Sequence, residues 1–98
     1  MATVVLAQQA VDDLASLSRT HSLPRDTSER VRRSIAPLNE FPLLGAPLTG
    51  RWTGFRFLLG PWRWMLVVYQ YDEKTDTVAI VTIQDARSAR APTTNDPI

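Results

Sequence analysis

The sequence predicts an α+β domain in which an N-terminal short strand and a helical hairpin pack on a mainly antiparallel, twisted sheet. Two observations carry this prediction. Between Arg51 and Arg87, three runs rich in β-branched and aromatic residues are separated by Gly60-Pro61 and by residues 72–76, and short turns between such runs produce antiparallel neighbours. Ahead of them, two segments carry apolar residues at the spacing of one helical face.

The first of these segments follows a short strand predicted over Ala2 to Leu6. From Ala7 onward, apolar residues at Ala10, Leu14 and Leu17 follow the i, i+4, i+7 spacing of a helix that ends near Arg19. His21, in the connector that follows, is the only histidine of the chain. Because no catalytic partner lies near it in sequence, we expect an exposed loop residue.

The second helix is predicted to begin near Asp26, which has the spacing of a capping box with Glu29. Pro37 ends it near Ala36, because the residue before a proline resists the α conformation. Its apolar face consists of Val31, Ile35 and Leu38. The two helices should form an antiparallel hairpin lying on the sheet.

A long irregular link spans residues 39–52, with prolines at 42 and 47 and glycines at 45 and 50. Long links in compact domains are often functional. We expect this one to be pinned to the core by its apolar residues, Phe41, Leu43, Leu44 and Leu48. Residues 1–90 are predicted to form a single domain, and the proline- and threonine-containing residues 91–98 a flexible tail.

The strand run from Trp62 to Tyr71 is the most informative stretch, because both of its alternating faces are apolar. Neither face suits open water. One face can be covered by the helices, and we expect the other to meet a partner protein. The residues expected to contact this partner or a target are Trp62, Trp64, Met65, Tyr69 and Tyr71.

Composition narrows the function classes. The 98 residues carry a net charge of +1 and no cysteine, which gives weak support for nucleic-acid binding through overall charge and excludes a thiolate zinc site. We expect no metal, no small-molecule cofactor and no membrane association. Residues 3–7 lack the basic flank of a signal peptide, and a cytoplasmic location is expected.

Four charged residues are candidates for a site at one end of the sheet. If Gly60-Pro61 is a two-residue turn, Arg56 lies opposite Met65, and Arg63 shares its face. Asp85 then falls opposite Arg63, with Arg87 beside it. Such a cluster can hold phosphate, or it can be an Arg63–Asp85 cross-strand pair with solvated neighbours. A slip of one residue in either turn would move one strand's side chains to the other face.

Catalysis by this cluster would need a proton carrier, because arginine does not lose its proton. Tyr69, Tyr71 and Asp85 are the candidates on the same face, and none of them is compelling. Trp62 and Trp64 pose a similar choice, since tryptophan can stack on bases but beside a sheet more often forms core or partner contacts.

A set of short motifs in order along the chain resembles the RelE/ParE superfamily of toxins from bacterial type II toxin–antitoxin modules. The resemblance covers roughly residues 4–90. The motifs are Leu6-Ala7, Ala10, Asp13-Leu14, Leu17, Leu38, Phe41-Pro42, Gly45-Ala46-Pro47, Gly54-Phe55-Arg56, Gly60, Arg63, Val68-Tyr69, Ile83 and Arg87.

This resemblance implies a growth-inhibiting toxin that a cognate antitoxin neutralises. RelE-like members cleave messenger RNA on the ribosome, and ParE-like members poison DNA gyrase. Arg56, Arg63 and Arg87 match basic positions of the RNase branch, and Tyr69 would be its proton carrier. Leu58 replaces a lysine of that branch, and its C-terminal tyrosine is missing. The resemblance therefore favours ParE-like poisoning of gyrase, with a ribosome-dependent endoribonuclease as the alternative.

Overall fold

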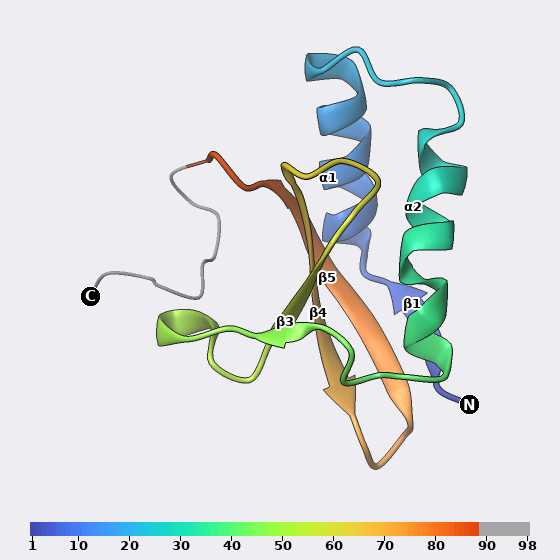
Figure 1. The fold of residues 1–98 in the computed structure, drawn as a ribbon, viewed down its shortest axis with the longest axis vertical. Coiled ribbons are helices and arrows are strands. Elements are labelled where there is room, and N and C mark those ends of the chain that lie inside the picture. The colour runs from blue at the N-terminus through green and yellow to red at the C-terminus, as the bar shows by residue number, and fades with distance from the viewer. Residues whose placement is uncertain (89–98) are drawn as a thin grey trace.

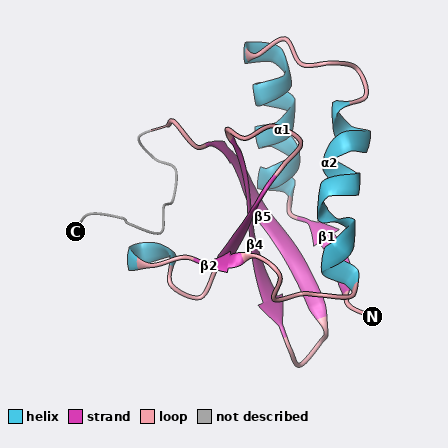
Figure 2. Cartoon of the chain, in the orientation of Figure 1, coloured by secondary structure: helices cyan, strands magenta, loops and turns pink. Residues whose placement is uncertain are grey.

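The computed structural model describes residues 1–88, which form two helices lying on one face of a five-stranded sheet (Figures 1 and 2). The predicted α+β fold class is confirmed. The strands are ordered β1-β5-β4-β3-β2. In chain order the elements are β1 (Thr3–Leu6), α1 (Gln8–Thr20), α2 (Thr27–Ile35), the 3-10 helix η1 (Ala36–Asn39), β2 (Ala46–Pro47), the 3-10 helix η2 (Gly50–Trp52), β3 (Arg56–Leu59), β4 (Met65–Asp72) and β5 (Thr77–Asp85).

The helical hairpin forms as its periodicity predicts, with α1 and α2 running side by side in opposite directions (Figure 1). Ala10 and Leu14 of α1 and Val31 and Ile35 of α2 are buried in the core. The predicted capping box is wrong, because the Asp26 side chain makes no cap hydrogen bond. Its carboxylate instead accepts a hydrogen bond from Arg30 Nε, 3.0 Å away.

The sheet combines an antiparallel meander, β3-β4-β5, with β1 joined in parallel to β5. The meander contains one irregularity. Val68 pairs with Thr82 and Tyr69 pairs with Ile80, so Val81 is an extra residue in β5. Such a bulge leaves backbone groups without ladder partners. The Asp13 carboxylate accepts hydrogen bonds from the Ile83 N–H, at 3.2 Å, and from the Thr82 hydroxyl.

Strand β4 is buried on both faces, which corrects the expected partner surface. Met65, Val67 and Tyr69 lie in the core beneath the helices. On the opposite face, Leu66 is 6% exposed and Val68 is fully buried. Trp52 and Phe55 line a shallow hollow on this second face together with Gln70, Thr82 and Gln84. The chain therefore covers its own second face, and the apolar groups open to a partner lie elsewhere.

The link between the helices and the meander is only partly pinned to the core. Leu48 is 3% exposed, as expected, but Phe41, Leu43 and Leu44 are more than half exposed, so the expectation is wrong for these three. The link contains η1, β2 and η2 rather than being irregular throughout. The tail predicted for residues 91–98, and the last two residues of the predicted domain, lie outside the described residues.

Candidate functional site

The predicted arginine cluster does not assemble, because β3 and β4 are joined by residues 60–64 rather than by a two-residue turn. Leu59 pairs with Leu66, and Arg56 pairs with Tyr69 instead of Met65. Arg63 lies exposed within the connection, outside the strands. Two backbone hydrogen bonds close this wider connection, from Gly60 N–H to Met65 O and from Met65 N–H to Trp62 O.

The reason for the wider connection lies in its two tryptophans, which turn back onto the helical layer. Trp62 lies under the guanidinium of Arg30 from α2, with 5.8 Å between the guanidinium carbon and the ring centroid. Trp64 stacks on His21, with 4.4 Å between ring centroids. The two tryptophans also stack on each other at 6.1 Å. Burying large aromatic area against the helix ends favours this geometry over a tight turn.

Arg56 and Tyr69, both predicted as RNase residues, hold the link in place. Arg56 Nη1 donates to the carbonyl oxygens of Gly45, at 2.6 Å, and Leu43, at 3.2 Å. The Tyr69 hydroxyl accepts a hydrogen bond of 2.8 Å from the Gly45 N–H. Gly45 is needed here, since an added Cβ would lie 2.6 Å from Phe57 O and 2.8 Å from the Tyr69 hydroxyl oxygen.

These contacts make Tyr69 a poor proton carrier. Its side chain is fully buried, and burial raises the pKa of its hydroxyl above the usual value, although the Gly45 hydrogen bond and Arg56 oppose the shift. A phenol with a raised pKa holds its proton at neutral pH. Tyr69 is thus better suited to anchoring the link than to acid–base chemistry.

At the other end of the sheet Asp85 and Arg87, which the sequence placed side by side, meet two residues that it did not place there, and we call the group the His21 cluster: His21, Trp64, Asp85 and Arg87. His21 Nε2 lies 3.1 Å from Asp85 Oδ2, and its Nδ1 lies 2.9 Å from the Thr20 hydroxyl. A carboxylate only accepts hydrogen bonds, so Nε2 carries a proton in this contact. His21 is therefore not the exposed, unpartnered loop residue that we expected.

Arg87 completes the cluster by donating three hydrogen bonds to Asp85, one from its backbone N–H and two from its guanidinium. Its Nε lies 3.0 Å from Oδ1 and its Nη2 lies 2.9 Å from Oδ2. Arg87 is the main reason why the pKa of the Asp85 carboxyl lies well below its ordinary value, with a smaller contribution from His21. Arg87 Nη2 also lies 3.5 Å from His21 Nε2. A cation and a group able to transfer a proton are thus brought together.

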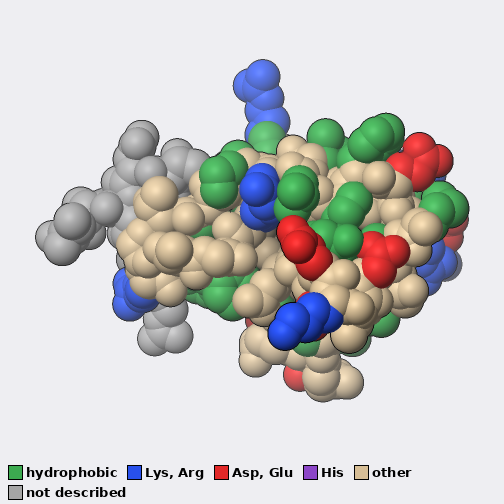
Figure 3. Space-filling model, turned by 90° about the horizontal axis from the view of Figure 1, so that it is seen from below, with side chains coloured by type: hydrophobic (Ala, Val, Ile, Leu, Met, Phe, Trp, Pro, Cys, Tyr) green, Lys and Arg blue, Asp and Glu red, His purple; other side chains and the backbone are tan. Residues whose placement is uncertain are grey.

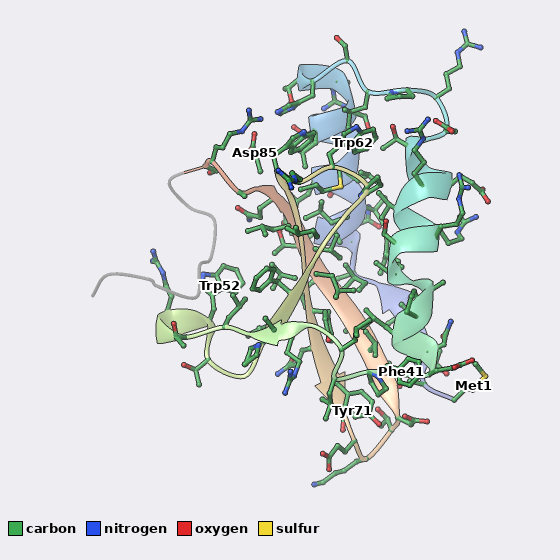
Figure 4. The ribbon with its side chains drawn as sticks, viewed as in Figure 1. Met1, Phe41, Trp52, Trp62, Tyr71 and Asp85 are labelled. Carbon is green, nitrogen blue, oxygen red and sulfur yellow. The ribbon has the colours of Figure 1, made fainter. Side chains whose placement is uncertain are left out.

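No sequence signal joins His21 to Asp85 and Arg87, because His21 and Asp85 are 64 residues apart. The register between β4 and β5 also differs from the expected one, since Asp72 pairs with Thr77 and Val81 is an extra residue in β5. Asp85 pairs with Met65 rather than lying opposite Arg63. Figure 4 shows Asp85 and Trp62 at one end of the sheet, with Tyr71 and Phe41 at the other end.

The residues predicted to contact an antitoxin or a target separate into two groups. Met65 and Tyr69 are fully buried and offer no area to a partner, so they are wrong as contact residues. Trp62, Trp64 and Tyr71 are partly buried against the core. Tyr71 directs its hydroxyl to Asp76, where the hydrogen bond measures 2.7 Å.

Exposed apolar groups gather instead in two other places. A groove between α1 and α2, with a volume of about 320 Å³, is lined by Leu6, Val11, Leu14, Val31 and Ile35 among others. Leu6 and Val11 in this groove are 40% and 45% exposed. The second place is the 41–44 segment, which lies beside Tyr71 and Glu73.

Strand β1 adds an open edge to the groove. It is an edge strand, with β5 as its only neighbour in the sheet order β1-β5-β4-β3-β2. Thr3 and Ala7 donate their N–H groups to Asp76 and Ile80 on the β5 side, and backbone direction alternates along a strand. The N–H and C=O groups of Val4 and Leu6 therefore face away from β5. Such an edge can accept a further strand.

The described part of the chain lacks two further features, a metal site and a membrane-spanning helix. No three His, Asp or Glu side chains within residues 1–88 are grouped so that they could hold a metal ion. Neither helix in this part of the chain is long and apolar enough to cross a membrane.

No protein-family model matches the sequence, and no curated protein matches it. Solved structures do match. A chain of the RelBE2 toxin–antitoxin complex of Mycobacterium tuberculosis is 26% identical, with a TM-score of 0.63, over 86% of this chain and 96% of that one. A chain of the ParDE system of P. aeruginosa gives a TM-score of 0.70 at 14% identity, over 89% of this chain and 98% of that one. The isolated E. coli RelE toxin gives a TM-score of 0.63 at 12% identity, over 92% of this chain and 89% of that one.

The last two likenesses concern the fold alone, and all three extend over nearly the whole of the compared chains. In this chain the compared region consists of two helices on one face of a sheet in which β1 is parallel to β5. The chain has the fold of the RelE and ParE toxins, and at 26% identity its sequence is also similar to a chain of the RelBE2 complex. The resemblance carried by the sequence motifs is confirmed.

Proposed function

We propose that this chain is a growth-inhibiting toxin of a bacterial type II toxin–antitoxin system and that a cognate antitoxin neutralises it. The support comes from the matching structures, which include the RelBE2, RelBE and ParDE toxin–antitoxin systems. For the antitoxin we propose the groove between α1 and α2, because its exposed Leu6 and Val11 adjoin the open β1 edge.

We further propose that the toxin poisons DNA gyrase without catalysing a reaction. The observation that supports this choice is the use of Arg56 and Tyr69 within the fold. Both were candidates for phosphate binding and proton transfer, and both are engaged with Leu43 and Gly45 of the link. An RNase of the RelE kind would have to function without them. Gyrase and the ribosome both act in the cytoplasm, where we expect the toxin to act.

The alternative, a ribosome-dependent endoribonuclease, is favoured by one observation. The His21 cluster holds an imidazole within 3.5 Å of an arginine. With Arg63 exposed on the nearby 60–64 connection, this end of the sheet presents cations and a group able to transfer a proton. In the present arrangement Asp85 and Thr20 occupy both ring nitrogens of His21.

Two assays on the purified toxin separate the mechanisms. In a gyrase assay, we expect loss of supercoiling or accumulation of cleaved DNA. In toeprinting on translating ribosomes, we expect messenger RNA to remain intact. Removal of a positioned proton-transfer group typically costs an RNase about 10²–10⁴-fold in rate.

Three variants make the test decisive. Cuts at the ribosomal A site that disappear in His21→Ala, Arg63→Ala or Arg87→Ala, with folding retained, would favour the endoribonuclease. Arg19→Ala is a matched control, because Arg19 lies in the last turn of α1 near His21 and outside the cluster. Gyrase inhibition that persists in all four variants would support the first mechanism.

A further inference from the structure

A second surface of the molecule has a composition unlike that of the groove. We call it the Phe41 surface, and its residues are Glu40, Phe41, Leu43, Leu44, Tyr71 and Glu73. Phe41 is 58% exposed, and Leu43 and Leu44 are each 54% exposed. Large apolar side chains gathered and exposed in this way mark interaction sites more often than isolated exposed residues do.

The backbone that carries these side chains is held rigidly. The Tyr69 hydroxyl and the Arg56 guanidinium together engage the N–H of Gly45 and the carbonyls of Leu43 and Gly45. The Leu44 N–H donates to Phe41 O at 3.0 Å, which closes the turn. A surface organised in advance loses little conformational freedom when a partner binds. The apolar side chains are therefore exposed on a fixed support.

The rim of the Phe41 surface is acidic. Glu40 and Glu73 line it, and Asp72 and Asp76 belong to the same β4–β5 end as Tyr71. Lys74 is the only basic residue of the 72–76 turn, although the whole chain has a net charge of +1. Figure 3 looks onto this end of the molecule, where acidic and hydrophobic side chains lie side by side, with basic side chains next to them.

The acidic groups of this surface differ in their contacts: Asp76 is bound to Tyr71, whereas Glu40 and Glu73 can pair with basic groups of a partner. The hydrogen bond to Asp76 raises the pKa of the Tyr71 hydroxyl, and the charges of Asp76, Glu73 and Asp72 raise it further. Asp76 is engaged by that bond and lies 4.0 Å from the Met1 α-amino group. Within residues 1–88, Glu40 and Glu73 form no salt bridge.

We infer that the Phe41 surface docks a protein segment that carries both apolar and basic side chains. Apolar groups would cover Phe41, Leu43 and Leu44, and lysine or arginine would face Glu40 and Glu73. The acidic rim repels phosphate, which disfavours RNA and an anionic membrane as occupants. The inference does not depend on whether the toxin acts on gyrase or on the ribosome.

Model peptides test this inference on the purified chain. The probe is an 18-residue amphipathic peptide of leucine and lysine, and its companion has glutamate in place of lysine. Fluorescence anisotropy should detect binding of the lysine peptide that weakens as salt is added, because the charge contacts are exposed. The glutamate peptide should not bind.

Matched variants locate the site. Leu44→Ser removes a central apolar contact, and Glu73→Lys reverses a charge of the rim. Each should weaken binding of the lysine peptide by about tenfold. Leu59→Ser and Glu29→Lys replace an exposed leucine and an exposed glutamate outside the surface, and binding should be unchanged. All four are surface substitutions, so melting temperatures should differ little.

Several results would overturn the inference. Absence of binding by the lysine peptide is one of them. Equal binding by the glutamate peptide is another, and so is an affinity that Leu44→Ser and Glu73→Lys leave unchanged. Binding of anionic lipid vesicles or of RNA that Leu44→Ser weakens and Glu73→Lys strengthens would show that the surface serves a different class of partner.

Discussion

Tyr69 and Tyr71 lie two positions apart on the same face of β4, yet their hydroxyl groups are in different surroundings. The Tyr69 hydroxyl is buried and accepts a hydrogen bond from the Gly45 N–H. The Tyr71 hydroxyl is partly exposed and donates to Asp76. A buried N–H that loses its acceptor destabilises the fold by the full free energy of its desolvation. An exposed hydroxyl that loses its partner can bind water instead.

Tyr69→Phe should therefore destabilise the fold more than Tyr71→Phe does. We expect Tyr69→Phe to lower the free energy of unfolding by about 1–3 kcal/mol, because it leaves the Gly45 N–H unpaired. Urea denaturation of the wild type and both variants measures the difference. Equal effects of the two substitutions would contradict the anchoring role of Tyr69.

At Asp85 the pKa of the carboxyl gives a prediction about pH. Because its pKa is lowered in the folded state, ionised Asp85 stabilises the fold at every pH above its ordinary value of 3.8, and this stabilisation is lost as the pH falls through the lowered value. Asp85→Asn should thus lower the melting temperature at neutral pH, and the difference from wild type should shrink in strong acid.

Melting curves between neutral pH and strong acid measure this effect. Asp26→Asn is a suitable control, since Asp26 forms an exposed pair with Arg30 and exposed pairs contribute little. A difference between wild type and Asp85→Asn that is constant over the whole pH range would show that the ionised carboxylate is not responsible.

Among the elements, α1 and β5 are joined at the bulge by a single carboxylate. Asp13 accepts from the Ile83 N–H and the Thr82 hydroxyl, both of which belong to the part of β5 beside Val81. Its neighbour Asp12 is exposed and forms a hydrogen bond of 2.9 Å with Gln8. Two adjacent aspartates of one helix thus differ in whether they contact the sheet.

We expect Asp13→Ala to lower the free energy of unfolding by about 1–3 kcal/mol, because it leaves the Ile83 N–H of β5 without its acceptor. Asp12→Ala should change it by less than about 0.5 kcal/mol, as is usual for exposed positions. Thermal or urea denaturation measures both values, and amide exchange at Ile83 should accelerate only in Asp13→Ala. Identical amide exchange at Ile83 in the two variants would argue against the contact between Asp13 and β5.

The elements themselves could be predicted from the sequence because their signals are local. Apolar spacing over a few turns found α1 and α2, and residue type found β3, β4 and β5. The connection lengths and registers between the elements could not be predicted in the same way. The length of the connection after Leu59 depends on how Trp62 and Trp64 pack against distant helices, and the positions of the candidate arginines depend on that length.

The site was predicted less well than the fold for the same reason. Arg56 and Tyr69 face one another across β3 and β4, but only the folded link shows that both are engaged with it. His21 acquires its partner from β5, which no spacing near His21 indicates. Neither the Asp13 contact nor the exposure of Phe41 has a signature in the sequence.

Over the whole molecule, the apolar groove and the Phe41 surface are separate and differ in charge. The groove runs between α1 and α2 beside the open edge of β1, and Arg32 contributes to its lining. The Phe41 surface has an acidic rim formed by Glu40 and Glu73. Since the two surfaces share no residue, a partner in the groove leaves the other surface open to a second partner.

The proposed role of the groove can be tested by neutralisation in cells. Val11 is 45% exposed in the groove, so Val11→Asp should cost the free toxin little stability. In a complex, however, the new carboxylate would be buried without a partner, which is strongly unfavourable. We expect cells producing this variant to remain inhibited when the antitoxin from the neighbouring reading frame is co-expressed, and the two proteins not to co-purify.

Leu59→Asp is the matched control, because Leu59 is 49% exposed on β3 and lies outside the groove. This variant should be neutralised and captured like the wild type. Equal neutralisation of both variants would show that the antitoxin binds elsewhere, while the toxin proposal itself would stand. Loss of toxicity in Val11→Asp without antitoxin would instead indicate that the groove contacts the target.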